Sequence, residues 1–518
     1  MSTSILRTSL RAGQASTPRI CRCRATFNAL NGANRARFNS SVSSPGSAQL
    51  TTPLPTPSQQ LYTLNEIDKL TASIAESAFG PVHHPSPLVM RALPAPWLSS
   101  HSPDLASQTD SSAHDAGTKT LEPISEEVLL RPKHMSESFT SFDLPLASDA
   151  KLYERYVNTS GGFRMGKLLE HLDSLAGAVA YRHCLPTPRA SYQTDSSIAF
   201  HEMSSRAGLY LATASADRLD MFGRLNRENV RDLKFSGFVT WTGRSSLEVV
   251  VKMEGRRLEE APGQYKTLML GRFAMVCRDS KTHKARQVPK LLVESEEEKV
   301  LWAIGEEHQK RRKTSAMNAL DKVPPSSEEA EELHKLMLQV STKEKVDGEE
   351  VVHMQDTEIQ TVQLMFPQDR NLHGKVFGGI LMRLVLITPS ELCFTNAALF
   401  AQAPMRFLSL DQITFRLPVP IGAVLRLSSK VVRTTHPHEG PDGEAKAHIV
   451  VRAEVEEVDT GVRRETNTFF FTMAKENSEP IGRTIVPSTY AEAMHYLEGK
   501  RRLEMGEEMR RLYKVGKS

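Results

Sequence analysis

The sequence predicts an α+β fold made of two similar units, each a long helix wrapped by a curved antiparallel sheet. The first observation is Gly166–Tyr181, whose apolar residues at positions 168, 169, 172, 175, 176 and 179 mark one face of an amphipathic helix. The second is a series of segments after this helix in which apolar and polar residues alternate, as in strands with one buried face. The third is that the same order of patterns returns in the C-terminal half, which indicates an internal repeat.

The two units can be compared element by element. The predicted strands are 209–216, 234–242, 247–252 and 267–278 in the first unit, and 405–416, 424–434, 447–458 and 463–474 in the second. Two short stretches match in order: Asp217-Arg218-Leu219 with Asp411-Gln412-Ile413, and Phe273-Ala274-Met275-Val276 with Phe471-Thr472-Met473-Ala474. One helix with four or five strands buries too few faces alone, so we expect each sheet to wrap its helix and the two units to pair. This arrangement is the tandem (double) hot-dog.

Composition divides the rest of the chain. The hot-dog domains are expected at 131–285 and 351–478, joined by a helical linker at 286–350 whose charges are expected on solvated helix faces. Residues 479–518 form a C-terminal helical extension, with a helix over 490–512. Residues 41–130 are rich in Ser, Thr, Pro and Ala and predict a low-complexity, disordered extension, in which only 62–79 has a helical pattern.

The first 40 residues have the composition of a mitochondrial transit peptide. Residues 1–65 contain seven arginines, no lysine and no acidic residue, and Arg- and Ser-rich leaders without acids are typical of mitochondrial import. We expect cleavage near Arg37–Ser40 and a location in the mitochondrial matrix. The alternative is a basic tail that contacts nucleic acid, for which aromatic residues and lysines are sparse.

Bulk composition narrows the function classes. Charged residues make up 24% of the 518 and hydrophobic residues 39%, as in globular proteins. No window approaches about 18 uncharged apolar residues, so no integral membrane segment is expected. Removing the +7 of the leader from the net charge of +4 leaves −3, which argues against nucleic acid as a partner. Outside the leader cysteines, Cys184, Cys277 and Cys393 are far apart in sequence, as in a reducing compartment.

A glycine-rich loop, Asn371–Met382, leads into the second predicted helix, and three interpretations of it stay open. As a nucleotide phosphate loop it is poor, because Val376 follows Gly374-Lys375 where Ser or Thr is needed. The glycines can serve close packing and a tight turn. Finally, free N–H groups at a helix N-terminus can bind an oxyanion or polarise a carbonyl.

A polarising site of this kind needs a carboxylate, and the first helix offers one. Asp173 lies between Leu172 and Leu175 in the half-apolar part of the pattern, where burying a carboxylate is costly. A general base that activates water requires such a position. The alternative, which stays open, is a helix-face acid paired with a basic neighbour.

Motifs for other chemistries are missing from the sequence. Neither G-x-S-x-G nor G-x-G-x-x-G occurs. His201-Glu202 begins like the zinc motif H-E-x-x-H but lacks the second histidine. His436-Pro437-His438-Glu439 has metal-binding residue types, but we expect it in a hairpin loop between two strands. We therefore expect no metal and no redox cofactor.

These features together resemble the mitochondrial double hot-dog branch of the acyl-coenzyme A thioesterases. Asp369–Met382 resembles the family signature N-x-x-G-x-x-x-G-G-x-L-M, and Gly166–Ser174 with Lys234–Gly243 is similar to that branch. The resemblance covers about residues 131–500. It implies hydrolysis of fatty acyl-CoA to fatty acid and CoA.

The resemblance also implies an active site shared by the two units. Carried over by position, Asn371 holds the water or the thioester oxygen, and Asp173 acts as general base or as nucleophile through an anhydride. A backbone N–H at Gly378 or Gly379 polarises the thioester carbonyl. The loop residues placed against the substrate are His373 and Gly374.

The mirror site departs from the family pattern. It would pair Asn158 with an acid on the second helix, but an alignment without gaps places Leu386 there, and the nearest carboxylate is Glu391. We therefore expect one working site and one degenerate site.

The second helix is also expected to break. Thr388-Pro389-Ser390-Glu391 fits a capping box that starts a new helix, so the first part should end near Ile387. Around Val385–Ser390 the chain is a few residues longer than the family pattern. Either an insertion kinks the helix, or the segment carries a mis-assigned splice junction.

Two other functions stay open. One is a non-catalytic or weakly active acyl-CoA-binding or regulatory hot-dog protein, in which the broken helix spoils hydrolysis. The other is a hot-dog dehydratase, which needs a histidine beside an acid and for which His373 is available. By analogy with other hot-dog proteins, a homo-oligomer that is a trimer of double hot-dogs is expected.

Overall fold

The computed structural model describes residues 64–79 and 123–515, apart from 159–160, 187–202, 226–228, 258, 261–263, 318–319, 321, 341–344, 347, 368–380, 383, 386–391, 440–442 and 477–478. All the described residues belong to one compact unit, Leu61–Ser518. The expectations for the leader and for the loop over 371–380 concern residues outside the described part. Within the described ranges, no helix combines the length and the hydrophobicity needed to cross a membrane.

The first repeat is a helix held against an antiparallel sheet. Its core helix is α6 (Met165–Cys184), preceded by α3 (Glu126–Leu129), α4 (Met135–Ser138) and α5 (Ala150–Glu154) and followed by an outer helix, α8 (Glu296–Met317). The strands are β2 (Thr140–Leu144), β3 (Leu209–Ala216), β4 (Leu219–Met221), β5 (Asp232–Thr242), β6 (Ser246–Arg256) and β7 (Lys266–Asp279). These bounds contain the predicted helix and all four predicted strands of the first unit.

The second repeat has the same order of elements. Its core helix is described at Leu381–Met382 and Leu384–Val385 and again as α11 (Leu392–Ala401), and its outer helix is α12 (Tyr490–Val515). The strands are β11 (Ile359–Leu364), β12 (Met405–Leu410), β13 (Ile413–Thr414), β14 (Val424–Thr435), β15 (Lys446–Glu456) and β16 (Arg463–Lys475). The single strand predicted over 405–416 is thus two strands, because the chain leaves the ladder at Asp411.

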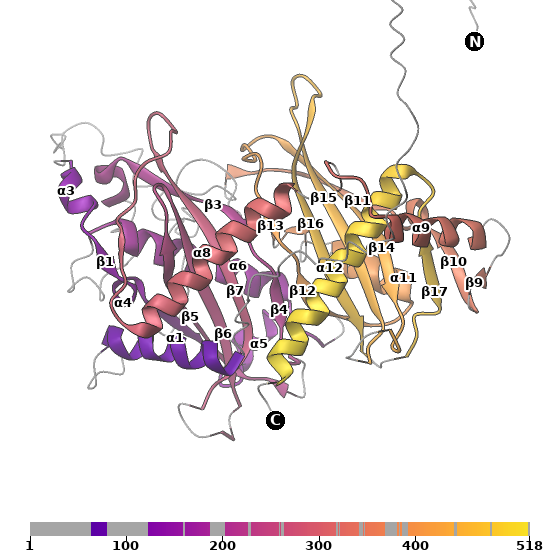
Figure 1. The fold of residues 1–518 in the computed structure, drawn as a ribbon, viewed down its shortest axis with the longest axis horizontal. Coiled ribbons are helices and arrows are strands. Elements are labelled where there is room, and N and C mark those ends of the chain that lie inside the picture. The colour runs from indigo at the N-terminus through magenta and orange to yellow at the C-terminus, as the bar shows by residue number, and fades with distance from the viewer. Residues whose placement is uncertain are drawn as a thin grey trace, which may run out of the picture. The chain divides into compact units, whose positions relative to one another are not determined.

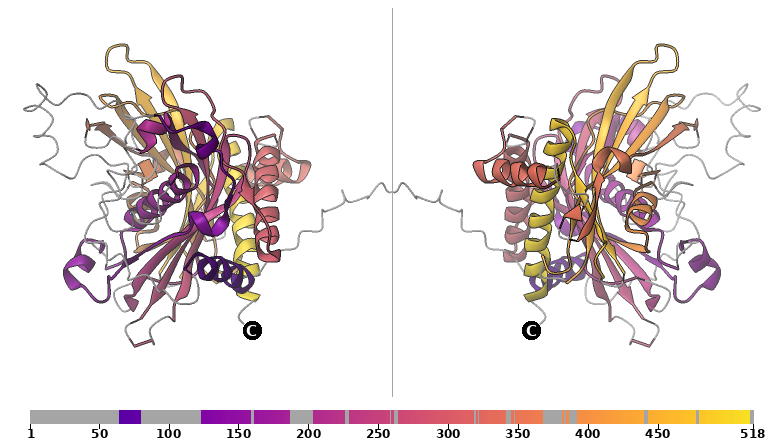
Figure 2. Two further views of the ribbon diagram at one scale, coloured as in Figure 1. Left: turned by 90° about the vertical axis from the view of Figure 1, so that its left-hand side faces the viewer. Right: turned by 90° about the vertical axis from the view of Figure 1, so that its right-hand side faces the viewer.

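The strands of both repeats form one 12-stranded sheet, with the main order β11-β14-β15-β16-β12-β4-β7-β6-β5-β2 (Figure 1). Two short reciprocal pairings join the repeats: β12 pairs with β4, and β13 pairs with β3. The core helix α6 lies on one side of this sheet, and α8 and α12 cross the other side (Figure 2). A helix wrapped by each antiparallel half confirms the predicted α+β tandem hot-dog.

The two repeats share one hydrophobic core. Leu168, Leu172 and Val179 of α6 are fully buried, and the cluster continues into the second repeat through Leu392 and Ala397 of α11. Fully burying one aliphatic side chain of this size contributes about 1.5–3 kcal/mol. The repeats are therefore not independent folding units, as expected from the small number of faces each can bury alone.

The outer helices belong to the repeat. The N–H of Glu298 in α8 donates to Ser295 Oγ at 3.2 Å, and the N–H of Glu492 in α12 donates to Thr489 Oγ1 at 3.2 Å. In both helices the glutamate also accepts, at 2.8 Å, the N–H of the residue four positions before it. The segments expected as a linker and as a C-terminal extension therefore contain equivalent helices of the two repeats.

The flanking elements follow the same symmetry. A parallel pair, β1 (Lys133–His134) with β8 (Leu291–Leu292), precedes α8, and a second parallel pair, β10 (Glu349–His353) with β17 (Arg483–Val486), precedes α12. Short helices follow β1 and β10, namely α4 and η3 (Met354–Thr357), and β9 (Lys345–Val346) pairs with β10. A further helix, α9 (Ser327–Val340), is tied to α12 by ion pairs of Arg501 with Glu329 and of Lys500 with Glu332.

Helix α1 (Leu64–Phe79) matches the helical pattern expected at 62–79 and packs on the first repeat. Ile67 and Ile74 are buried against Phe238 of β5 and Val250 of β6. The helical stretch expected within 41–130 is thus a helix whose apolar face covers the sheet on the side where α8 lies.

Candidate active site

The carboxylate of Asp173 lies in the core of the first repeat. Asp173 is on α6 and is 0% exposed. Its Oδ1 accepts a hydrogen bond from Oγ1 of Thr213, on β3, at 2.9 Å. A hydroxyl that donates to a buried carboxylate favours its ionised form and fixes its orientation. Because no part of Asp173 is exposed, a position on the solvated helix face is excluded.

Thr213 is a site residue that the sequence did not single out. It lies on the same side of β3 as Leu209 and Leu211, which are buried. The sequence did contain one indication of its role: Thr213 follows Leu209 and Leu211 at every second position, on the side of the strand that faces the core. Strand alternation alone does not show which side chain of α6 the hydroxyl meets.

The predicted partners of Asp173 lie outside the described residues. These are Asn371, His373, Gly374, Gly378 and Gly379 of the loop; Glu391, the predicted partner of Asn158 in the mirror site, also lies outside the described residues. The pairing of Asp173 with the Asn371 loop therefore stays a prediction.

The mirror loop around Asn158 is described, and it is a tight turn. Oδ1 of Asn158 accepts the N–H of Gly162 at 2.8 Å, and the N–H of Asn158 donates to the carbonyl of Gly162 at 2.8 Å. Gly161 supplies the positive φ of +82° that the turn requires. The amide N–H of Gly162, three residues before the core helix, is thus already bonded to Asn158.

The sheet register aligns the two core helices. Gly237 of β5 pairs with Thr140, the first residue of the edge strand β2. Ser429 of β14 pairs with Ile359, the first residue of the edge strand β11. Gly237 and Ser429 therefore occupy equivalent positions. A Cβ added at Gly237 would lie 3.5 Å from Val179 of α6, and Ser429 Oγ accepts from Asn396 of α11 at 2.9 Å. Val179 and Asn396 are therefore equivalent.

This match gives a second count for the mirror acid position. Counting back along the sequence from Asn396 places Ser390 opposite Asp173, whereas the ungapped count from Asn158 and Asn371 places Leu386 there; both residues lie outside the described part of the chain. By the count from Asn396, Glu391 matches Ser174. The expectation of an insertion around Val385–Ser390 stays a prediction, because 386–391 lie outside the described residues.

The strand position of Thr213 also differs between the repeats. Thr213 pairs with Met275 immediately before a bulge in β3, and Phe407 pairs with Met473 immediately before the equivalent bulge in β12. Phe407 therefore stands where Thr213 stands in the first repeat. The mirror site has a phenyl ring in place of the hydroxyl.

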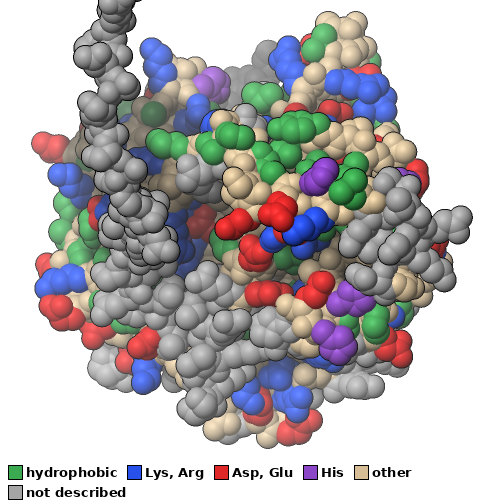
Figure 3. All heavy atoms as spheres, turned by 45° about the vertical axis from the view of Figure 1, so that its right-hand side comes forward, with side chains coloured by type: hydrophobic (Ala, Val, Ile, Leu, Met, Phe, Trp, Pro, Cys, Tyr) green, Lys and Arg blue, Asp and Glu red, His purple; other side chains and the backbone are tan. Residues whose placement is uncertain are grey.

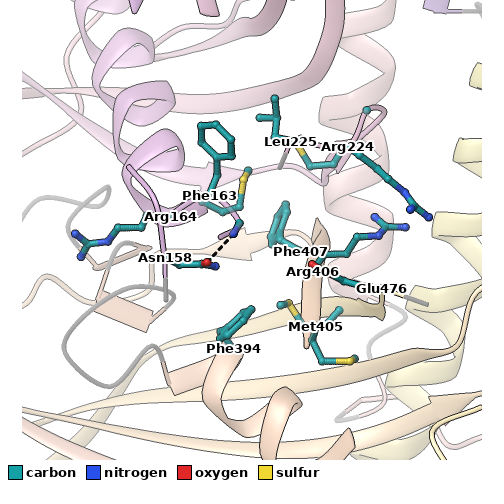
Figure 4. Close-up of a pocket in the computed structure, with 15 residues that line it drawn as sticks. Asn158, Phe163, Arg164, Arg224, Leu225, Phe394, Met405, Arg406, Phe407 and Glu476 are labelled. Carbon is teal, nitrogen blue, oxygen red and sulfur yellow. Dashed lines mark hydrogen bonds between the residues drawn. The ribbon is translucent and has the colours of Figure 1, made fainter. Parts of the chain in front are cut away.

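A cavity of about 130 Å³ lies at the mirror site. Asn158 and Phe163 line it from the first repeat, and Phe394 and Phe407 line it from α11 and β12 (Figure 4). Arg224 and Arg406 extend toward the same side of the cavity in this view. The cavity thus combines apolar side chains with arginines at one side.

A group of buried charges lies on the opposite face of the sheet from Asp173. Nη1 of Arg312, on α8, donates to Asp217 at 2.9 Å and to Glu248 at 3.0 Å. Burial raises the pKa of Glu248 to about 7 and also raises the pKa of Asp217, against the lowering effect of the nearby arginines. The expectation that the charges of 286–350 are solvated is wrong for Arg312, whose side chain is 16% exposed, because it neutralises these buried acids.

Metal-binding residue types do not converge in the described part of the chain. No group of three or more His, Cys, Asp and Glu side chains there could hold a metal ion. His436, in the segment noted for its histidines, lies with Nε2 3.0 Å from Glu349. Cys184, Cys277 and Cys393 are free and buried.

No family model matches the chain. Among curated proteins, mitochondrial acyl-coenzyme A thioesterase 9 of Mus musculus is 32% identical over 386 residues, covering 73% of this chain and 80% of that protein. Mitochondrial acyl-coenzyme A thioesterase 9 of Homo sapiens is 31% identical, covering 72% of this chain and 78% of that protein. Mitochondrial acyl-coenzyme A thioesterase 4 of Humulus lupulus is 31% identical, covering 74% and 69%.

Solved structures with similarity are acyl-CoA hydrolases and thioesterases. The acyl-CoA hydrolase of Staphylococcus aureus in complex with butyryl coenzyme A, coenzyme A and coenzyme A disulfide is 20% identical, with a TM-score of 0.28, and covers 32% of this chain and 96% of that one. An oleoyl thioesterase (putative) of Lactobacillus plantarum is 10% identical, with a TM-score of 0.36, and covers 65% and 96%. The hot-dog assignment therefore rests on the strand order and core helices described above.

Proposed function

Because the chain belongs to the acyl-coenzyme A thioesterase family, we propose that it hydrolyses fatty acyl-CoA to free fatty acid and CoA at one site. Asp173 of the first repeat forms this site with the Asn371 loop of the second. The buried carboxylate of Asp173 carries the proposal, because an acid at 0% exposure on a core helix is costly without a purpose.

In the proposed reaction the C–S bond of the thioester breaks, and CoA leaves as the thiol. Asp173 either takes a proton from the attacking water or attacks the carbonyl itself, forming an anhydride that water then opens. Thr213 holds one carboxylate oxygen in place in both routes. A backbone N–H at Gly378 or Gly379 stabilises the developing oxyanion, and Asn371 holds the water or the thioester oxygen.

Only one of the two sites is proposed to be catalytic. In the mirror site the count from Asn396 places Ser390 where the first repeat has Asp173, and Phe407 stands in the position of Thr213. The N–H of Gly162 is bonded to Asn158, so it does not offer a donor to an oxyanion. All three differences remove groups that the reaction needs.

The test compares two carboxylate substitutions in a thiol-release assay with short-, medium- and long-chain acyl-CoAs. Asp173→Asn should lower kcat by about 10²–10⁴-fold, the range expected for loss of a general base. Glu391→Gln should have a smaller effect. Equal losses in both variants would contradict the single-site proposal, and no thiol release by the wild type would favour the acyl-CoA-binding alternative.

We also propose a mitochondrial location, in the matrix. The Arg-rich, acid-free leader and the mitochondrial naming of the thioesterases of mouse and human support it. Protease protection of the full chain in isolated mitochondria and mitoplasts tests it. Digestion in mitoplasts would exclude the matrix.

A trimer of double hot-dogs is proposed for the assembly. Apolar side chains gather on the face that the second repeat presents in Figure 3. Val362 and Leu364 on the edge strand β11 and Leu399 on α11 are 52%, 43% and 63% exposed. Exposed apolar residues at an unpaired sheet edge favour self-association. Light scattering on the purified chain tests this state, and a monomeric mass would contradict it.

A further inference from the structure

The cavity at the mirror site has the features of a binding site, although Phe407 stands there in place of the hydroxyl of Thr213. Its described lining is mixed: apolar side chains, among them Phe394, Phe407, Met405 and Met473, lie beside polar and charged ones. Methionine and aromatic side chains of this kind adapt to apolar ligands. We propose that this cavity binds a short-chain monocarboxylate, of about four to six carbons, as a non-catalytic ligand.

The size of the cavity sets the length of the ligand. An apolar protein cavity of about 150 Å³ is large enough for one benzene molecule. The volume of about 130 Å³ therefore fits an aliphatic chain of four to six carbons.

The charge of the ligand follows from Arg406. This residue lines the cavity, and its Nε is buried without a hydrogen-bond partner in the described part of the chain. A buried N–H donor of a guanidinium is costly unless an acceptor satisfies it. A carboxylate is the acceptor with the matching charge and geometry.

The neighbouring charges leave an excess of positive charge. Glu444 accepts from Arg406, and Arg224 donates to the same Glu444 oxygen at 3.3 Å. One carboxylate is thus shared by two guanidinium groups. Arg164 also lines the cavity, and Glu476, which is exposed, is the acidic residue of the lining.

A carboxylic acid of this length is also what hydrolysis of a short acyl-CoA releases. The identification of the ligand with the reaction product rests on the proposed function. Binding of a carboxylate to the cavity does not depend on that function, so the binding proposal and the proposed function can fail separately.

The experiment is a methyl NMR titration of the full chain labelled with [¹³C-methyl]methionine. Sodium butanoate and sodium hexanoate are the probes, and Met405→Leu and Met473→Leu assign the reporting signals. We expect saturable shifts of these methyl groups, with a dissociation constant of about 1 mM or tighter. 1-Hexanol, which has the same chain without the charge, should bind about tenfold more weakly.

Substitutions then locate the ligand. Arg406→Gln should weaken hexanoate about tenfold and leave 1-hexanol unchanged, and its own methyl spectrum reports that it is folded. Phe407→Trp should fill the cavity and remove both ligands. Arg416→Gln is the matched control, because Arg416 is 62% exposed and pairs with Glu465; it should bind hexanoate like the wild type.

Three results would overturn the proposal: no saturable shift in the wild type, equal affinity for hexanol and hexanoate, or loss of the shifts in Asp173→Asn, which would place the ligand in the catalytic site. Thiol release by the wild type is measured separately. A wild type that binds hexanoate without hydrolysing acyl-CoA would sustain the carboxylate site and refute the proposed function.

Discussion

Replacing Thr213 by valine tests the part of the site that the structure defines best. The substitution keeps the branched shape of the side chain and removes the hydroxyl that donates to Oδ1 of Asp173 at 2.9 Å. Because Asp173 is 0% exposed, water cannot replace the lost donor without entering the core. The carboxylate would then lose the constraint that Thr213 places on its orientation and part of the stabilisation of its ionised form.

The size of the effect follows from the charge of the acceptor. A hydrogen bond to a charged group contributes about 1.5–3 kcal/mol, more than one between neutral groups. If the full amount is needed in the transition state, kcat/KM falls by roughly 10- to 150-fold. The loss should appear mainly in kcat, because Thr213 acts on Asp173 and is not proposed to bind CoA.

The assay is thiol release from butanoyl-CoA and a long-chain acyl-CoA, with two controls. Thr213→Ser keeps the donor and should remain close to the wild type. Thr435→Val makes the same chemical change at a hydroxyl whose oxygen is buried and has no hydrogen-bond partner in the described residues, so it should leave kcat/KM unchanged. Wild-type kcat/KM in Thr213→Val would refute the positioning role of Thr213.

Three further predictions concern the buried charges and use the free energy of unfolding, measured with urea. Arg312→Met removes the arginine that donates to both Asp217 and Glu248, although Arg272 stays 3.8 Å from Glu248. It should cost about 3 kcal/mol; a loss under about 1 kcal/mol would show that these acids are well solvated. Arg218→Met should lower the free energy of unfolding by as much. Gln412→Met, at the equivalent position of the second repeat, should leave it nearly unchanged. Equal effects of the two substitutions would contradict the different environments of Arg218 and Gln412. Burial lowers the pKa of Lys133 from 10.5 to about 8, so its contribution to stability is complete above pH 10.5 and is lost as pH falls through about 8. Between those two pH values the free energy of unfolding of the wild type should rise by about 3 kcal/mol relative to that of Lys133→Met. The same pH dependence in both proteins would contradict the buried ammonium.

Periodicity predicted most of the fold because it depends on local pattern. The strands of both repeats and the helix α6 were expected within a few residues, since each has one apolar face along its length. The edge strands β2 and β11 were not predicted, because they precede their helices and contribute few buried residues. The equivalence of α8 and α12 was missed because their sequences differ, and only their capping glutamates and sheet contacts reveal it.

The candidate site was predictable only in part. Asp173 could be found because a carboxylate interrupts an apolar helix face, whereas Thr213 lies 40 residues later on a strand, and its contact depends on how the sheet wraps the helix. The mirror position predicted at Leu386 stays a prediction, because 386–391 lie outside the described residues. A count back from Asn396, which contacts Ser429, favours Ser390.

Two buried aspartates, at the point where the sheets of the two repeats join, differ in which repeat supplies the arginine that pairs with them. Asp217 and Asp411 occupy equivalent positions, and each forms an ion pair with an arginine. For Asp217 the cation is Arg312 of its own outer helix, while the strand residue across the junction is Gln412. For Asp411 the cation is Arg218 from the other repeat. The equivalent outer-helix residue is Gly506, seven positions after Gly499 as Arg312 is after Gly305.

Gly506 is therefore needed because Arg218 fills its space. A Cβ at Gly506 would lie 2.1 Å from Nη2 of Arg218, which cannot move freely because it donates to Asp220 at 3.0 Å and to Ser409 at 2.7 Å. Gly506→Ala should cost about 1–3 kcal/mol in the wild type. In an Arg218→Ala background the same change should instead stabilise by about 0.5–1 kcal/mol, because alanine favours a helix interior over glycine. An equal cost in both backgrounds would show that the glycine serves another contact.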